Sequence, residues 1–216
     1  DVIAEKVRLA GVVGTGGAAF PAHVKMSPPP EKKIRTLILN GVECEPYLTA
    51  DHRMMLEEPE RILQGVALLQ YAFGAERVVG GSSAEKPDAI ALLEMECSGT
   101  PVEVMPLQVK YPQGAEKQLI AAVTGREVPS GGLPMDVGVA VHNISTAAAV
   151  TDAVLYGRPL IERVCTVTGP AIREPKNLRI RIGTQLSHLV EVCGGLIEEP
   201  GKIVLGGPMM GFTQLG

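Results

Sequence analysis

The chain has 216 residues, of which 45% are hydrophobic and 20% charged, and its formal net charge at pH 7 is −4. This composition is typical of a folded globular protein, and no apolar run reaches the roughly eighteen residues that would span a membrane. The negative charge and an aromatic content of 3% argue against capture of nucleic acid by basic patches or by base stacking.

Strands that alternate with helices dominate the chain up to about residue 156. A helix is predicted over residues 1–10, followed by a glycine-rich loop at 14–21 and an exposed proline connector at 28–30. The predicted strands lie at 34–39, 77–81, 102–107 and 137–141. The predicted helices lie at 58–73, 87–97, 114–123 and 145–156. This alternation is typical of right-handed βαβ units, so we expect an α/β fold with a mostly parallel, Rossmann-like sheet.

The pattern changes near residue 160. Short segments there alternate apolar and polar residues, as half-buried antiparallel strands do. The expected elements are strands at 161–169, 178–183 and 202–207 and a helix at 184–193. We therefore expect two domains, an α/β domain over residues 1–158 and a small α+β domain over residues 159–216.

The glycine-rich loop is the first candidate for chemistry. Glycines at 14, 16 and 17 would let backbone N–H groups approach a phosphate or a flat ring, and Lys25 could supply a counter-charge. The spacing is neither the dinucleotide fingerprint nor the Walker A pattern. A purely structural turn is an equal alternative.

The second candidate is the segment NGVECEPY at 40–47, which follows a predicted strand. Ligands of open α/β sheets bind at the carboxyl ends of strands. Two carboxylates and an amide in this turn could accept hydrogen bonds from hydroxyls or ring N–H groups, and helix capping by these acids is the alternative. The loops at 111–116 and 141–143 follow later strands and should reach the same edge of the sheet.

Other reactive side chains form no known catalytic or metal pattern. The cysteines at 44, 97, 165 and 193 are far apart, and the four histidines lack the spacing of a zinc helix. His142 could bond a ligand, although a structural role is favoured. Met209 and Met210 are expected to fill core space. No metal site and no catalytic side chain are therefore predicted.

Four motifs resemble the C subunit of the Rnf electron-transport complex and, more distantly, the flavin-bearing NADH-oxidising subunit of respiratory complex I. They are GVVGTGGAAFPAHVK, LILNGVECEPYLTAD, YPQGAEKQLIAAVTGREVPSGG, and TVTG followed by GGPMMGF. They occur in the family's order and cover nearly the whole chain. The cobalamin-reductase subunit of propanediol-utilising microcompartments shares the first two, but YPQGAEKQL and REVPSGGLP favour Rnf.

The resemblance implies an FMN- and NAD(H)-binding domain of the complex I type followed by a β-grasp domain of the SLBB kind. It further implies electron transfer between NADH and ferredoxin in an ion-translocating complex, bound through other subunits to the cytoplasmic face of the bacterial inner membrane. The family's [4Fe–4S] clusters need four-cysteine motifs that are absent here. We therefore expect a fragment without clusters that is inactive with the physiological acceptor, ferredoxin being reached only indirectly.

The resemblance also assigns residues to the cofactor. Gly14, Gly16 and Gly17 would form a backbone cradle beneath the flavin. Lys25 would neutralise the flavin phosphate.

Further residues would complete the flavin pocket. Asn40 and Glu43 would hold the ribityl chain and the ring. Gly114, Glu116 and Asn143 would close the pocket.

Two residues would face the nicotinamide, which Phe20 would flank and Glu45 would contact. The chain departs from the family pattern at Val42 and Ala115, where complex I has acids, and at Ala19, where a glycine is usual. These departures leave open a second hypothesis, a non-catalytic assembly module that docks onto partner subunits.

Overall fold

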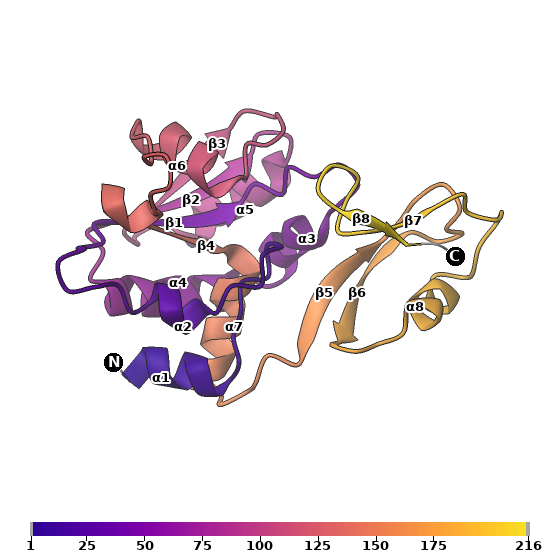
Figure 1. Ribbon diagram of the computed structural model, residues 1–216, viewed down its shortest axis with the longest axis horizontal. Helices are drawn as coiled ribbons and strands as arrows, with labels where there is room; N and C mark the ends of the chain where they lie inside the picture. The colour runs from indigo at the N-terminus through magenta and orange to yellow at the C-terminus, as the bar shows by residue number, and fades with distance from the viewer. Residues whose placement is uncertain (1, 215–216) are drawn as a thin grey trace.

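A parallel four-stranded sheet forms the centre of the larger part of the molecule, in a computed structural model that describes residues 2–214. The strand order is β3-β2-β1-β4, and each neighbouring pair is parallel. The strands are β1 (Thr36–Gly41), β2 (Arg77–Ser83), β3 (Val102–Leu107) and β4 (Val139–Asn143). The predicted α/β fold with a parallel sheet is therefore confirmed (Figure 1).

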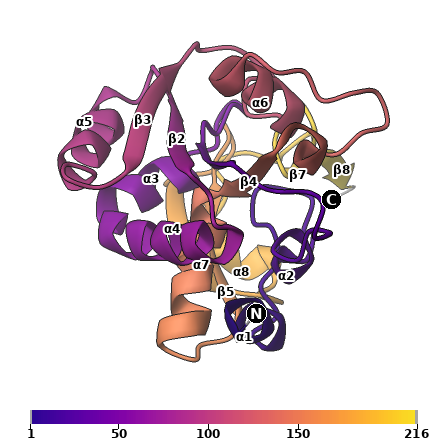
Figure 2. The ribbon, with the colours of Figure 1, turned by 90° about the vertical axis from the view of Figure 1, so that its left-hand side faces the viewer.

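Helices cover both faces of this sheet, so β1, β2 and β4 are largely buried, whereas most of the edge strand β3 is partly exposed. Figure 2 shows α6 on one side and α4 and α7 on the other. The helices are α1 (Val2–Leu9), α2 (Ala22–Lys25), α3 (Ala50–Glu57), α4 (Pro59–Phe73), α5 (Pro87–Glu96), α6 (Glu116–Thr124) and α7 (Ile144–Leu155), with a 3₁₀ turn at Pro134–Val137. The helices α2 and α3 were not predicted, because α2 is a single turn and α3 is half polar, so that neither shows a clear apolar periodicity.

The sheet separates two hydrophobic cores. The larger core joins α1, α4 and α7 to one face, with Leu37, Leu69 and Val150 fully buried. The smaller core lies under α6 and includes Ile38 and Leu119. Because β1 contributes Leu37 to one core and Ile38 to the other, its alternating side chains fix the sheet between the two helix layers.

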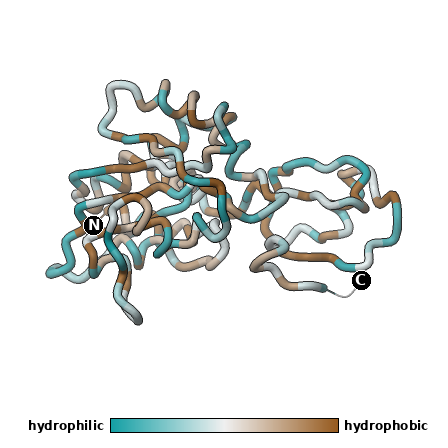
Figure 3. The backbone as a smooth tube through the Cα atoms, turned by 90° about the horizontal axis from the view of Figure 1, so that it is seen from above, coloured by the Kyte–Doolittle hydropathy of each residue, from teal (hydrophilic) through white to brown (hydrophobic). Residues whose placement is uncertain are grey.

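The second, smaller part contains two antiparallel strand pairs and one helix. Strand β5 (Glu162–Val167) pairs with β6 (Lys176–Arg181), α8 covers Leu186–Val192, and β7 (Ile203–Leu205) pairs with β8 (Phe212–Gln214). Strand β8 was not predicted. Seen from above, a narrower region joins this part to the α/β part (Figure 3).

The methionines of the smaller part differ from the expectation. Met209 and Met210 do not fill core space, since 54% and 78% of their surfaces are exposed. They lie in the loop between β7 and β8, outside both hydrophobic cores. Within residues 2–214 no helix has the length and apolar character to cross a membrane.

Candidate functional site

Loops far apart in the sequence meet at the carboxyl edge of the parallel sheet. Asn40, at the end of β1, donates from Nδ2 to the Gly114 carbonyl at 2.8 Å. Asn143, at the end of β4, donates from Nδ2 to the Asn40 carbonyl at 3.4 Å. The sequence prediction that these loops share one edge is thereby confirmed for the loops after β1, β3 and β4.

The glycine-rich loop is fastened to the same edge by Thr15. Its backbone N–H donates to Thr146 Oγ1 at 3.0 Å, and its hydroxyl donates to Asn143 Oδ1 at 2.9 Å. Asn143 Oδ1 also accepts the N–H of Ser145 at 2.8 Å and thus caps the start of α7. The loop is therefore held beside the positive end of a helix, a favourable place for an anion.

Beyond Thr15 the loop is open to solvent at residues 16–20. A Cβ added at Gly16 would lie 3.3 Å from Asn143 Cβ, whereas one added at Gly17 would meet no atom within 4 Å. Ala19 has a φ of 49°, in the left-handed region that costs a non-glycine residue about 1 kcal/mol. This backbone conformation is one that glycine adopts without that cost.

Lys25 lies at the end of α2 with its ammonium near the same edge. It donates to Glu116 Oε1 at 2.6 Å and to the Val141 carbonyl at 3.2 Å. The side chains of Lys25 and Glu116 are 35% and 38% exposed. The ammonium is thus held in place while staying accessible to an anionic group.

Glu43 caps a helix within the described structure, which is the alternative that the sequence left open. Its carboxylate accepts the backbone N–H of Asp51 at 2.7 Å and of His52 at 3.1 Å, at the start of α3. The φ of Glu43 is 47°. Burial raises the pKa of this carboxyl, and the neighbouring Asp51 raises it further.

Asp51 is a site residue that sequence reasoning missed. It accepts hydrogen bonds from Asn143 Nδ2 at 2.6 Å and from the Ser145 hydroxyl at 2.7 Å. Burial raises the pKa of its carboxyl in spite of these two donors. Asp51 lies inside the quoted motif LILNGVECEPYLTAD, but its role follows from the fold of α3, which was not predicted.

Glu45 binds the second domain. Its carboxylate oxygens accept the backbone N–H groups of Met209 at 3.0 Å and Met210 at 2.8 Å. Phe20, the other residue expected at the nicotinamide, is 46% exposed, and its carbonyl accepts the Gly14 N–H at 2.8 Å. The contacts of both residues with a nicotinamide stay predictions.

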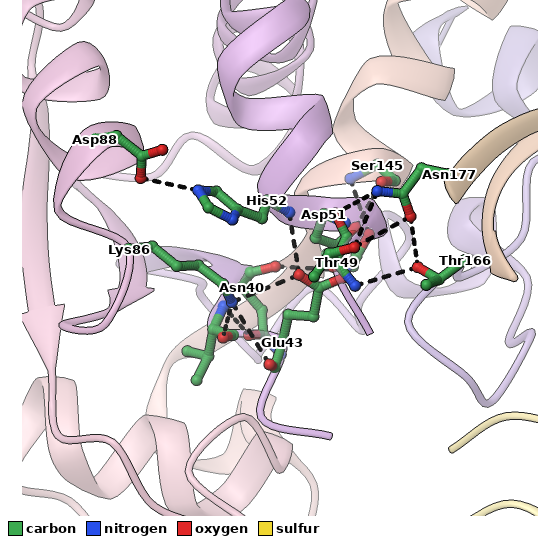
Figure 4. A network of polar contacts seen from close by, with 12 residues as sticks. Asn40, Glu43, Thr49, Asp51, His52, Lys86, Asp88, Ser145, Thr166 and Asn177 are labelled. Carbon is green, nitrogen blue, oxygen red and sulfur yellow. Dashed lines mark hydrogen bonds and ion pairs between the residues drawn. The ribbon is translucent and has the colours of Figure 1, made fainter. Parts of the chain in front are cut away.

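A polar network joins the two domains beside this site (Figure 4). Thr49 donates its backbone N–H to Thr166 Oγ1 at 3.1 Å, and Asn177 Nδ2 donates to Thr49 Oγ1 at 2.9 Å. Thr49 immediately precedes α3, while Thr166 and Asn177 lie on β5 and β6. The second domain therefore rests on the element that carries Asp51.

A cleft also lies elsewhere, between α4, α7 and the β5–β6 pair. Its volume is about 890 Å³, and it contains none of the residues predicted for cofactor binding. Arg61 pairs there with Glu58 and Asp152, and Arg179 also pairs with Glu58. Because these charges pair with one another, the carboxyl edge of the sheet is the better candidate for a ligand site. The described residues contain no cluster of histidine, cysteine or acidic side chains suited to a metal ion.

His142 has a structural position, as the sequence favoured. It is 4% exposed, its ring lies 5.7 Å from that of Phe73, and its Nε2 has no hydrogen-bond partner. Burial, with a smaller effect of Lys25, lowers its pKa to about 3. The ring is therefore neutral in the folded protein at neutral pH.

The buried neutral imidazole predicts a pH-dependent stability. Unfolded histidine titrates near pH 6.5, so the unfolded chain binds this proton first, and stability should fall as pH decreases from about 6.5 toward 3. Between pH 7 and pH 5 the loss from His142 alone should be about 2 kcal/mol. Urea unfolding at both pH values checks this, with His142→Gln as the variant that should lack this part of the loss. An equal pH dependence in the two proteins would contradict the prediction.

Comparisons with known proteins agree with the motifs. The family model for the Nuo51 FMN-binding domain matches residues 7–152, and the SLBB domain model matches residues 164–213. The C subunit of the proton-translocating ferredoxin:NAD(+) oxidoreductase complex of Clostridium ljungdahlii is 54% identical over 96% of this chain and 46% of its own length. The C subunit of the Na(+)-translocating complex of Acetobacterium woodii is 50% identical over 99% of this chain and 48% of its own.

These matches confirm the resemblance predicted from the four motifs, and the chain spans about half the length of these curated relatives. Among solved structures, an NAD+-reducing [NiFe]-hydrogenase in the H2-reduced state aligns with a TM-score of 0.76. It is 24% identical, and the alignment covers 91% of this chain and 39% of that chain. At this identity the likeness supports the fold alone.

Proposed function

This chain belongs to the family of the Nuo51 FMN-binding domain, and we propose that its α/β domain binds FMN at the carboxyl edge of the sheet. Its curated relatives are C subunits of ion-translocating oxidoreductase complexes. The observation that carries the proposal is the glycine loop, fastened by Thr15 and open at residues 16–20. When bound, FMN accepts a hydride from a nicotinamide and releases the electrons one at a time.

The residues at this edge suit the parts of FMN. The backbone of Gly14, Gly16 and Gly17 would lie beneath the flavin, where side chains would obstruct it. Lys25, steadied by Glu116 at 2.6 Å, would neutralise the phosphate.

The remaining candidates would surround the flavin. Asn40, Gly114 and Asn143, which are already bonded to one another, would line the pocket. Glu43 would contribute by fixing the start of α3, since its carboxylate is occupied there.

We also propose that the bound FMN takes part in electron transfer between NADH and ferredoxin. NAD(H) would meet the flavin beside Phe20, with Glu45 turning from Met209 and Met210 toward the nicotinamide. Electrons would pass between NADH and ferredoxin through iron–sulfur clusters outside these residues, in an ion-translocating complex held to the cytoplasmic face of the membrane by its other subunits. The domains would divide at residues 158 and 159, and the chain alone would not reduce the physiological acceptor.

A titration with FMN tests the proposal. Flavin fluorescence should change saturably as the chain is added at micromolar concentrations. Riboflavin, which lacks the phosphate, should bind more weakly. The absence of saturable FMN binding would contradict the proposal and favour the assembly-module hypothesis.

Replacing Lys25 with alanine should weaken FMN binding by about 1.5–3 kcal/mol, the usual contribution of a hydrogen bond to a charged group. The affinity for riboflavin should stay nearly unchanged, because the ammonium acts on the phosphate. Isothermal titration of both ligands measures the difference, with Lys32→Ala as the control for loss of one charge. Equal losses for the two ligands would remove Lys25 from the phosphate site.

A further inference from the structure

Lys86 is a buried lysine in the turn between β2 and α5, and neither the motifs nor the proposed ligand contacts include it. Its side chain is 5% exposed. Its Nζ donates to the Val42 carbonyl at 2.7 Å and lies 3.5 Å from both the carbonyl and a carboxylate oxygen of Glu43. A lysine is rarely buried without such partners, because removing an ammonium from water is costly.

We infer that Lys86 is a positioning residue that holds residues 42–45, the loop after β1, in the conformation required by the FMN site, an inference that rests on the proposed function. This loop needs support, because Glu43 has a φ of 47°, which is unfavourable for a residue with a side chain. The ammonium donates to the Val42 carbonyl, which precedes this backbone angle, and to the Glu43 carbonyl, which follows it. It thereby stabilises the conformation that the bare backbone would avoid.

The fixed loop orders the rest of the site through a continuous set of contacts, of which Figure 4 shows the part from Lys86 and Glu43 to Asp51. The Glu43 carboxylate holds the first N–H groups of α3 at Asp51 and His52. Asp51 in turn holds Asn143, and Asn143 holds Thr15 of the glycine loop. Lys86 therefore acts on the flavin cradle without lying in it.

Lys86 also compensates a pair of buried acids. The Glu43 carboxylate accepts the backbone N–H of Asp51, and burial raises the pKa of both carboxyls while Lys86 opposes the increase. The other cation that acts on Asp51 is Arg163 of β5. The His52 ring does not pair with these acids in the same way, because its Nε2 lies 2.8 Å from Asp88 Oδ1.

Loss of the Lys86 ammonium would remove a positive charge that offsets the negative charges of Glu43 and Asp51. Near neutral pH one of them would take up a proton, or the loop would move to separate them. Protonation at lower pH would relieve the repulsion and restore the loop. FMN binding by a variant without the charge should therefore depend on pH in a way that the unmodified chain does not.

The test uses the 216-residue chain with Lys86→Met and with Lys86→Gln, which keeps a donor for the Val42 carbonyl but lacks the charge. Lys32→Met is the matched control. Lys32 also forms an ion pair, with Asp136, but its side chain is 40% exposed instead of buried. One measurement is the backbone amide exchange of Asp51 and His52 without ligand. The other is the FMN affinity from about pH 5.5 to about pH 8, because a carboxyl whose pKa is raised takes up a proton more readily as the pH falls.

In both Lys86 variants the two amides should exchange faster. At about pH 8 FMN should bind about tenfold more weakly or worse, the size expected for a lost bond to a charged group. Most of the affinity should return at about pH 5.5, and Lys32→Met should behave like the unmodified chain.

Three results would contradict either the role of Lys86 or the proposed binding of FMN. Unchanged exchange and unchanged affinity would overturn the inference. Faster exchange with a pH-independent affinity would reduce Lys86 to a structural role and overturn it as well. If the unmodified chain binds no FMN, the proposed function fails, while the exchange measurement still decides whether Lys86 fixes the loop.

Discussion

FMN binding should be lost when Gly16 is replaced by valine, with the fold kept. A Cβ at this position would already lie 3.3 Å from Asn143 Cβ, closer than ordinary van der Waals contact. Valine adds two further methyl groups beside Asn143, at the edge where the flavin is proposed to approach the backbone of the exposed stretch at 16–20. We expect the affinity to fall about a hundredfold or more, equivalent to about 2.7 kcal/mol.

Flavin fluorescence titration measures this loss, and urea unfolding checks the fold. Because Gly16 is exposed, the free energy of unfolding should change by less than about 1 kcal/mol. Gly201→Val is the matched control, since a Cβ at Gly201 meets no atom within 4 Å. Normal FMN binding by a folded Gly16→Val variant would show that the loop is a structural turn, the alternative that its spacing left open.

Replacing Gly65 with alanine should destabilise the protein by about 3 kcal/mol or more, the upper range for an overpacked interior. Gly65 lies in α4 where this helix contacts α7, and an added Cβ would lie 1.9 Å from the Ala147 carbonyl oxygen and 2.9 Å from Thr151 Oγ1. Alanine favours a helix over glycine by about 1 kcal/mol. This gain is too small to offset an overlap with rigid backbone, so the two helices must move apart.

Denaturant unfolding measures the loss, with Gly201→Ala as the control for the same substitution at an open position. Separation of α4 from α7 should also weaken FMN binding, because Asn143 and Thr146 lie at the start of α7. An unfolding free energy equal to that of the unmodified chain would show that the helices adapt at little cost.

Local signals in the sequence were sufficient for the elements of the sheet. Proline at the start of α4 and glycine after its end predicted that helix close to its observed bounds, Pro59–Phe73, because both residues act through their own backbone. Strand β3 was predicted at its observed bounds. Helix α3 was missed, since its polar stretch is ordered by Glu43, which caps it from outside.

Patterns along the chain were enough to establish the βαβ alternation and the family, because each depends on residues close together in the sequence. The gathering of distant loops at the carboxyl edge then followed from the parallel sheet, since parallel strands end at the same edge. The contacts of the charged residues became visible only in the folded arrangement. Lys86 is 44 residues from Val42, and Glu45 is 164 residues from Met209. Such pairs form because packed helices and strands bring them together and burial then requires each charge to have a partner. The positions of these residues along the chain therefore do not indicate which residues will pair.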